Sequence, residues 1–346
     1  MSKIVDLRSD TVTLPTDRMR EAMARAEVGD DVFGEDPTVR RLEELGAELM
    51  GKEAGLFLVS GTMANLVALL SHCGRGAEVI VGDRAHILNS EVGGASALGG
   101  IHMGAVPNDR LGAVSLQAVR EAMRPQNIHY PPTGLVTIEN SHNRCGGAVL
   151  DVASTEALCD LAHEFGVPVH LDGARIFNAA VALGVPAVAL ARPADSVCFC
   201  VSKGLSAPVG SVLTGGRSFI ERARKNRKMV GGGMRQAGVI AAAGIVALET
   251  MVDRLADDHR NARRLAEGLA QLPGIDIDLE PVRTNIVHFQ MAEGAMDPQR
   301  FAAGLQAEGV LCLPRDRRGV RMVTHYGIED ADIERALEAA RRVMAG

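Results

Sequence analysis

Short apolar segments alternate with amphipathic segments over the first two thirds of the chain. Six apolar runs predict strands, at residues 55–60, 78–82, 134–139, 167–171, 196–201 and 210–215. Helical patterns lie between most of them, at 62–70, 116–123 and 155–165. Continuous apolar strands joined by helices are typical of a parallel sheet covered on both faces. We therefore predict an α/β fold with a mixed, mostly parallel seven-stranded sheet covered by helices. Segment 210–215 follows 196–201 too closely for a helical crossover, so we expect an antiparallel edge strand or hairpin partner there.

Capping residues mark two helices before the first strand. Thr16 and Asp17 begin one helix. Asp36 is a suitable N-cap for the other, Pro37 suits its first turn, and Gly51 suits its end.

The last third of the chain has a different pattern. A helical stretch is predicted over 236–271, and strands follow at 284–291 and 319–326, with helices near 298–308 and 330–344. This pattern predicts a small C-terminal α/β domain. The boundary lies within 245–275, and we divide the chain into a large domain, 1–252, and a small domain, 253–346.

Polar residues follow the predicted strands of the large domain, where open α/β sheets bind their ligands. Gly61 and Thr62 follow the first strand and begin a helix, and His86 follows the second. Asp172 and Lys203 follow two later strands. Each residue alone has an ordinary structural explanation, such as a helix cap, a turn or a lysine that reaches water.

Together these residues suit one cofactor, pyridoxal 5'-phosphate. It needs a lysine that binds it covalently and a carboxylate on its ring nitrogen. A helix N-terminus can bind its phosphate, because free N–H groups and the helix dipole attract anions. A flat side chain such as histidine can stack on the ring. The large domain, 1–252, is therefore the expected cofactor-binding domain.

Several motifs resemble those of the L-threonine aldolases of low specificity, which are pyridoxal-phosphate enzymes with the aspartate-aminotransferase-like fold. The similarity extends from "DLRSDTVT" (6–13) to "VRMVTH" (320–325). It includes "SGTMANLVALLSH" (60–72), "VHLDGARIFNA" (169–179), "SKGLSAPVGS" (202–211) and "GGGMRQAG" (231–238). The resemblance implies cleavage of L-threonine and L-allo-threonine to glycine and acetaldehyde, in a reversible reaction that breaks the Cα–Cβ bond.

The resemblance also implies roles for the cofactor-binding residues. Lys203 would bind the cofactor as an imine, Asp172 would keep the ring nitrogen protonated, and His86 would stack on the ring. The remaining residues expected to bind the cofactor are Gly61, Thr62, Arg175 and Arg235. Of these, Arg235 is expected to reach the phosphate from a neighbouring subunit, which implies a homo-oligomer, at least a dimer and by resemblance a tetramer.

Substrate binding is assigned in the same way. Ser9, Arg175 and Arg321 would bind the substrate carboxylate, and Arg321 places the site between the two domains. Cleavage needs a base for the β-hydroxyl proton, and an imidazole titrates in the right range. His86 is the first candidate and His129 the second, although His86 can also serve only to stack on the ring.

The composition of the chain limits the classes of partner and the compartment that we expect. The formal net charge of −6 argues against nucleic acid or a membrane surface as the main partner. The start of the chain has no apolar segment of a signal peptide, and no apolar run suits a membrane span. The six cysteines have no framework spacing, and "HNRC" (142–145) has no second ligand pair, so we predict a cytoplasmic protein with reduced thiols and assign no metal ligands. A cation near Thr11–Thr13 stays open, because the family resemblance allows it and no ligand cluster in the sequence establishes it.

Two other functions remain open from the sequence. One is a different enzyme of the same fold, such as a transaminase or a β-eliminating lyase. The other is a catalytically silent relative that acts as a binding subunit, although Lys203, Asp172 and His86 together argue against it.

Overall fold

The computed structural model describes residues 3–345. A seven-stranded sheet forms the centre of the larger part, and its spatial order is β2-β8-β7-β6-β5-β3-β4. Its strands are β2 (Ala54–Leu58), β3 (Glu78–Gly82), β4 (His102–Val106), β5 (Thr133–Glu139), β6 (Val169–Asp172), β7 (Ser196–Cys200) and β8 (Ser211–Gly215). All neighbouring pairs are parallel except those of β8, which is antiparallel to β2 and β7. The predicted mixed, mostly parallel sheet is therefore confirmed.

Two details of the sheet differ from the sequence prediction. The β8 strand does pair with β7 as a hairpin partner, but it lies inside the sheet, between β2 and β7, and not at an edge. The edge strand β4 was not predicted, because "HMGAV" is short and only its last residue is buried.

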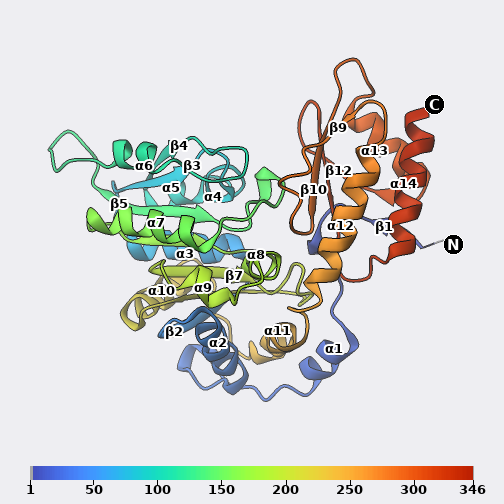
Figure 1. Ribbon diagram of the computed structural model, residues 1–346. Helices are drawn as coiled ribbons and strands as arrows, with labels where there is room; N and C mark the ends of the chain where they lie inside the picture. The colour runs from blue at the N-terminus through green and yellow to red at the C-terminus, as the bar shows by residue number, and fades with distance from the viewer. Residues whose placement is uncertain (1–2, 346) are drawn as a thin grey trace.

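Helices cover both faces of this sheet (Figure 1). The helices of the larger part are α1 (Asp17–Ala24), α2 (Pro37–Met50), α3 (Gly61–His72), α4 (His86–Asn89), α5 (Gly94–Gly99), α6 (Leu116–Ala122), α7 (Val152–Glu164), α8 (Ile176–Leu183), α9 (Ala187–Ala191), α10 (Arg217–Met229) and α11 (Gly238–Thr250), of which α1 packs on α11. The predicted caps are confirmed: Thr16 accepts a hydrogen bond from the Met19 N–H, and Asp36 from the Val39 N–H. Over residues 3–345, every helix is too short or too polar to cross a bilayer.

The apolar strands are explained by burial on both sides. In β7, Val197 and Phe199 belong to a core that includes residues of α2, α7 and α11. Cys198 points to the other face and packs with residues of α3 and α10. Because successive side chains of a strand point to opposite faces, a sheet covered twice needs apolar residues at every position.

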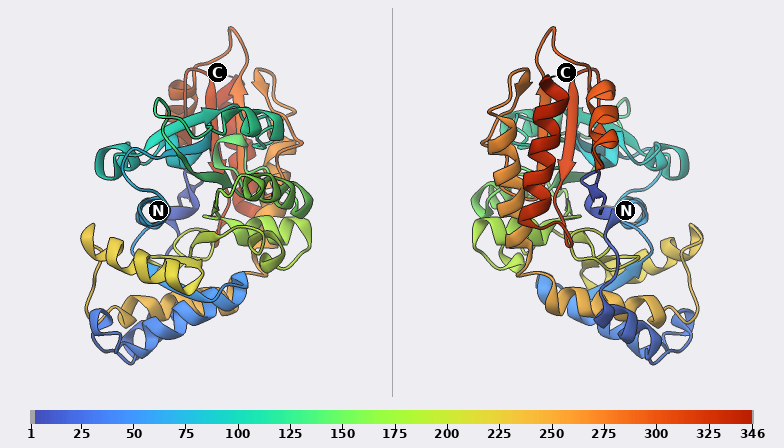
Figure 2. Two further views of the ribbon diagram at one scale, coloured as in Figure 1. Left: turned by 90° about the vertical axis from the view of Figure 1, so that its left-hand side faces the viewer. Right: turned by 90° about the vertical axis from the view of Figure 1, so that its right-hand side faces the viewer.

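A second, smaller sheet has the order β12-β13-β10-β9 and is antiparallel. Its strands are β9 (Ile275–Asp276), β10 (Ile286–Met291), β12 (Leu313–Pro314) and β13 (Gly319–Val323). The helices α12 (Leu255–Leu269), α13 (Pro298–Ala307) and α14 (Asp330–Ala345) contribute to its core. They lie on the outer side of the sheet, away from the large sheet (Figure 2).

The N-terminal segment packs with the small sheet and not with the large one. Strand β1 (Val5–Asp6) pairs in parallel with β11 (Val310–Leu311), and Val5 and Leu7 are buried in the small core. The division predicted from the sequence places these residues in the large domain. A parallel partner some 300 residues away in the chain leaves no local pattern that would reveal it.

The predicted helical stretch 236–271 is two helices. Residues 251–254 separate α11 from α12. Leu255, at the start of α12, packs in the large core, whereas Ala262 and Leu265 pack in the small core. The chain therefore passes from one core to the other along α12.

Candidate active site

The site lies where the parallel strands end. Strands β2, β3, β6 and β7 run in the same direction, so their carboxyl ends lie at the same end of the sheet. This end faces the small sheet (Figure 1). Gly61, His86, Asp172 and Lys203 lie at or just beyond these ends. The position expected from the sequence is therefore the one observed.

Asp172 ends β6 and is 2% exposed. Its Oδ2 accepts a hydrogen bond from Asn65 Nδ2 (2.9 Å), and its Oδ1 accepts one from the Ala174 N–H (3.1 Å). Asn65 stands on α3, one turn after Gly61. These bonds fix the orientation of the carboxylate.

A buried chain of hydrogen bonds holds Asn65 in turn. His170 Nε2 lies 3.1 Å from Asn65 Oδ1, and its Nδ1 lies 2.9 Å from Ser196 Oγ, which is 2.8 Å from His72 Nε2. Burial lowers the pKa of His170 to about 4 and that of His72 to about 3, so both rings are neutral. Because Asn65 Oδ1 can only accept, His170 donates from Nε2 and accepts from Ser196 at Nδ1.

His86 forms a close pair with a carboxylate that the sequence prediction missed. His86 Nδ1 lies 2.8 Å from Glu91 Oε1, and Glu91 is buried. The same Oε1 accepts a hydrogen bond from Asn65 Nδ2 (2.8 Å). One atom each of His86, Glu91 and Asp172 lie within 4.8 Å of one another. Asn65 thus gives one hydrogen to each of two neighbouring carboxylates, which reduces their repulsion.

The pair sets the protonation of both partners. The hydrogen bond to Glu91 raises the pKa of His86, and the charges of Asp172, Glu91 and Glu139 act in the same direction against the effect of burial. Burial raises the pKa of Glu91, while His86 and Asn65 oppose that rise. With Glu91 as acceptor at Nδ1, the neutral imidazole keeps Nε2 free as a base.

Arg175 is neutralised within the chain. Its Nε and Nη2 donate to the two oxygens of Asp10, both at 2.7 Å. Asp10 is fully buried and also accepts a hydrogen bond from Asn285 Nδ2 (3.0 Å). Although burial opposes ionisation, the charge and hydrogen bonds of Arg175, with the charge of Lys203, hold the pKa of Asp10 well below its usual value. Ser9, beside Asp10, accepts hydrogen bonds from the N–H and hydroxyl of Thr11.

Arg321 keeps an uncompensated charge. It is 8% exposed, and it donates only to neutral acceptors, Asn143 Oδ1 (2.9 Å) and the Arg8 carbonyl (3.1 Å). Its Nε is buried without a partner in the described part of the chain. Burial and the nearby charge of Arg175 lower its pKa to about 10. Of the two arginines expected to bind a carboxylate, Arg321 is therefore the one that still lacks an anion.

The residues present fit pyridoxal phosphate. Lys203 is half-buried and has no ion pair within residues 3–345, while its backbone carbonyl is fixed by Thr13 Oγ1 (3.1 Å). A Cβ on Gly61 would lie 2.9 Å from Cys200 Sγ, so only glycine lets the start of α3 approach β7 this closely. The N–H groups of Gly61 and Thr62, in the first turn of α3, therefore lie close to the end of β7, which Lys203 follows. A phosphate can bind to N–H groups of this kind.

Two predicted residues lie outside this cluster. Arg235 is exposed and pairs with Asp30 (3.0 Å) in a loop before α11. His129 is exposed and belongs to the loop that precedes β5, whereas Asp172 ends the parallel strand β6. The loop before β5 lies at the far end of the sheet from the small sheet (Figure 1). A role for His129 at this type of site would require a second copy of the chain.

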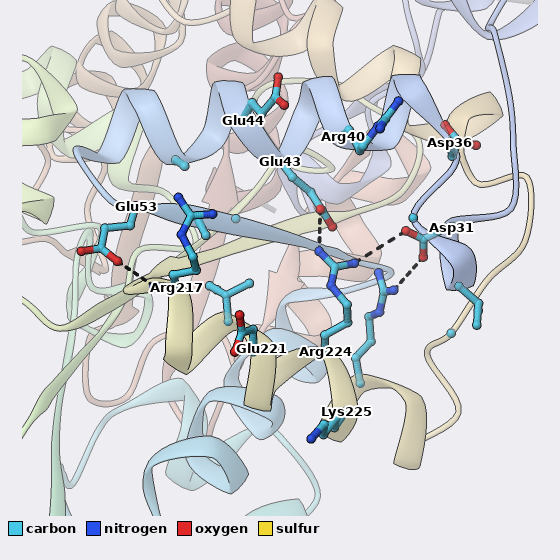
Figure 3. Close-up of a pocket in the computed structure, with 18 of the residues that line it drawn as sticks. Asp31, Asp36, Arg40, Glu43, Glu44, Glu53, Arg217, Glu221, Arg224 and Lys225 are labelled. Carbon is cyan, nitrogen blue, oxygen red and sulfur yellow. Dashed lines mark hydrogen bonds and ion pairs between the residues drawn. The ribbon is translucent and has the colours of Figure 1, made fainter.

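A groove of about 1010 Å³ lies elsewhere, between α2 and α10, and its lining does not include Lys203, Asp172 or His86. Its central charges pair with each other: Arg224 contacts Glu43 (2.7 Å) and Asp31 (3.8 Å), and Arg227 contacts Asp31 (2.6 Å) (Figure 3). These paired charges neutralise one another, and the groove lacks the cluster of lysine, carboxylate and imidazole found at the strand ends.

Known proteins are similar to this chain over nearly its whole length. The sequence model of the beta-eliminating lyase family matches residues 6–293. The low-specificity L-threonine aldolase 1 of Arabidopsis thaliana is 48% identical over 98% of this chain and 96% of its own length. The low specificity L-threonine aldolase of Escherichia coli strain K12 is 48% identical over 94% of this chain and 95% of its own.

Solved structures share the fold. A threonine aldolase of Leishmania major superposes with a TM-score of 0.83 and covers 98% of this chain and 99% of its own, at 20% identity. A serine palmitoyltransferase of Sphingomonas wittichii has a TM-score of 0.78, covers 98% of this chain and 87% of its own, at 16% identity. The family match spans most of the sequence, and so this chain belongs to the beta-eliminating lyase family.

Proposed function

We propose that the chain is a pyridoxal-phosphate-dependent L-threonine aldolase, which cleaves L-threonine and L-allo-threonine reversibly to glycine and acetaldehyde. The observation that carries the proposal is one cluster at the carboxyl ends of the strands. Asp172 lies within 4.8 Å of the hydrogen-bonded His86–Glu91 pair, Lys203 follows the neighbouring strand, and Arg321 keeps a buried Nε without a partner among the described residues. The names of the aldolases that are 48% identical support the reaction.

The cofactor would be held by residues at three strand ends. Lys203 supplies the amine that binds it, Asp172 the carboxylate for its ring nitrogen, and Gly61 and Thr62 the N–H groups for its phosphate. When bound, pyridoxal phosphate supplies a reactive carbonyl and an electron sink for the pair released from the Cα–Cβ bond. The buried chain from Asn65 to His72 keeps Asp172 in place and excludes water from its inner side.

Arg321 would bind the substrate carboxylate. Its guanidinium is already oriented by Asn143 and the Arg8 carbonyl, so little side-chain freedom is lost when the anion arrives. Arg175 contributes indirectly, because its bond to Asp10 fixes the segment that carries Ser9. A carboxylate fixed in this way sets which bond at Cα stands perpendicular to the cofactor ring.

His86 would take the proton of the β-hydroxyl. Its Nδ1–H donates to Glu91, so the neutral ring presents Nε2 as the base, and the carboxylate stabilises the imidazolium that forms. We propose that His86 also stacks on the cofactor ring. The roles of His129 and Arg235 would be exercised in a neighbouring subunit's site.

We further propose a homo-oligomer in the cytoplasm. Large apolar side chains are exposed at Leu14 (70%), Phe33 (74%) and Val92 (99%), and a contact between subunits would remove them from water. The six cysteines form no disulfide, in keeping with a reducing compartment.

The test is an assay on the purified holoenzyme with each threonine isomer as sole substrate. L-Threonine and L-allo-threonine should both yield acetaldehyde, and the D-isomers should not react. A reaction that begins only after a keto acid is added would identify a transaminase. A protein that binds the cofactor but converts no isomer would instead be a silent relative.

A further inference from the structure

A pocket of about 410 Å³ lies between the large and the small domain, next to Arg321. The large domain contributes Arg84 and Arg144, and the small domain contributes His288, Arg315 and Arg321. His288 and Arg321 face each other across neighbouring strands β10 and β13. The pocket therefore collects four arginines at the junction of the two domains.

These positive charges are not balanced within the chain. No carboxylate of residues 3–345 lies within 4.0 Å of a guanidinium nitrogen of Arg84, Arg144, Arg315 or Arg321, whereas arginines elsewhere, such as Arg110, Arg124 and Arg175, form such pairs. Asp316 is the single acidic residue of the lining. Its Oδ1 accepts hydrogen bonds from the backbone N–H groups of Arg318 (3.0 Å) and Gly319 (2.7 Å). Its charge partly opposes the lowering of the pKa of Arg315 and of His288, but one carboxylate does not balance four guanidinium groups.

The groups in the pocket affect one another. Burial and the charge of Arg144 lower the pKa of Arg315. Burial and the charges of Arg315, Arg321 and Arg84 lower the pKa of His288. Positive potential from both domains thus converges on the same space, and a concave wall of low dielectric strengthens it.

Two buried nitrogen atoms of residues that line the pocket have no partner. His288 Nε2 and Arg321 Nε are both inaccessible to solvent and make no hydrogen bond within the described residues. Buried polar atoms of native proteins are nearly always satisfied, so each unpaired atom calls for a ligand or ordered water. Solvated surface arginines would explain Arg84 and Arg144 alone, but they do not explain the unsatisfied atoms of His288 and Arg321, which line the same pocket.

We propose that this pocket binds a small dianion, either a phosphate or a dicarboxylate, that bridges the two domains. Guanidinium groups suit both chemistries, because they donate two parallel hydrogen bonds to oxygen pairs. Binding of the dianion does not depend on the proposed reaction. Arg321 lines this pocket and is also the residue proposed to bind the substrate carboxylate. A dianion in the pocket therefore offsets the charge of Arg321 and weakens the binding of an amino-acid carboxylate. By reciprocity the amino acid weakens the dianion equally.

The test is calorimetric titration of the holoenzyme, prepared in a phosphate-free buffer, with inorganic phosphate and, separately, with malonate. Sodium chloride keeps the ionic strength constant, and the bound cofactor fills its own phosphate site. The variants are Arg315→Gln and Arg144→Gln. The matched control is Arg317→Gln, which removes the same charge from the same exposed turn but outside the pocket.

We expect one saturable site per chain for at least one of the two probes. Arg315→Gln and Arg144→Gln should weaken it at least tenfold, and Arg317→Gln should leave it unchanged. The probe that binds identifies the class of dianion. Saturating dianion should also raise the dissociation constant of glycine in the wild type, but not in Arg315→Gln. Absence of binding by both probes, or equal weakening by Arg317→Gln, would overturn the proposal, and would do so whether or not the protein cleaves threonine.

Discussion

Replacement of Glu91 by glutamine tests the assignment of the base. The side chain keeps its size and can still accept a hydrogen bond from His86 Nδ1, which lies 2.8 Å from Glu91 in the wild type, but it loses its charge. A hydrogen bond to a charged partner contributes about 1.5–3 kcal/mol and a neutral one about 0.5–1.5 kcal/mol. The difference, about 1–1.5 kcal/mol, corresponds to about one unit in the pKa of His86, because one unit equals about 1.4 kcal/mol.

The sign of the charge gives the direction of the shift. The negative charge of Glu91 favours the imidazolium, so His86 in the wild type becomes neutral only above its usual pKa near 6.5. If neutral His86 is the base, kcat/KM should fall below that raised pKa. In Glu91→Gln the pKa falls, so the acid limb of the profile should move by about one unit to lower pH. The plateau should fall on the order of tenfold, because a weaker base transfers the proton more slowly.

The assay is acetaldehyde release from L-threonine between pH 5 and pH 9. The control is Glu249→Gln. The Glu249 carboxylate is exposed and makes a loose ion pair with Arg18 at 3.9 Å, so the pH profile of this variant should match that of the wild type. The reasoning would be refuted if the acid limb of the Glu91→Gln profile moved to higher pH. It would also be refuted if the limb stayed in place, because the profile would then report a group that is insensitive to this carboxylate.

The remaining predictions concern four residues of the cluster. Lys203→Ala should lose turnover and the adduct that borohydride traps, and a trapped adduct on another lysine would contradict the assignment. Asp172→Asn should retain part of the cofactor but lose kcat by about 10²–10³-fold, as removal of one preorganised electrostatic partner does; near-normal turnover would require another acid at the ring. Arg321→Lys keeps the charge but loses paired hydrogen bonds of about 1.5–3 kcal/mol, so KM should rise about 10–100-fold while kcat changes less; an unchanged KM would exclude it from the carboxylate site. His86→Phe should bind cofactor with the wild-type absorbance yet cleave about 10²–10⁴-fold more slowly, whereas wild-type cleavage would leave stacking as the only role of His86.

The strand-end residues could be predicted because their positions depend on fold class alone. In an α/β sheet, the residues that follow the parallel strands all lie at the carboxyl end of the sheet. The residues Gly61, His86, Asp172 and Lys203 can therefore be grouped without knowledge of any contact. The large sheet was predictable for a similar reason, since burial on both faces leaves continuous apolar runs.

The partners of these residues could not be predicted in the same way. Glu91 follows His86 by five residues across a short helix and a turn, and no pattern assigns that spacing to a hydrogen bond. Asn65 lies on α3, one turn after Gly61. Its side chain reaches Asp172 because α3 packs with that face against the sheet, and the sequence does not show this packing. Asp10 stands in the "SDTVT" segment, but its pairing with Arg175 spans 165 positions of the chain.

The N-terminal strand and the two unclustered residues show the limit more clearly. β1 joins the small core through a partner that only the tertiary fold brings near. Arg235 was assigned by resemblance and His129 as a second candidate base, and one copy of the chain places neither beside Asp172. Contacts between subunits leave no trace in the pattern of a single sequence.

The central claim is that this chain breaks the Cα–Cβ bond of threonine, within a family whose name refers to β-elimination. The most direct measurement identifies the products of uniformly ¹³C-labelled L-threonine by NMR after incubation with the holoenzyme and no other co-substrate. Labelled glycine and acetaldehyde in equal amounts, absent with Lys203→Ala, is the result that the account predicts. Labelled 2-oxobutanoate with an equal amount of ammonia would show β-elimination and would contradict it.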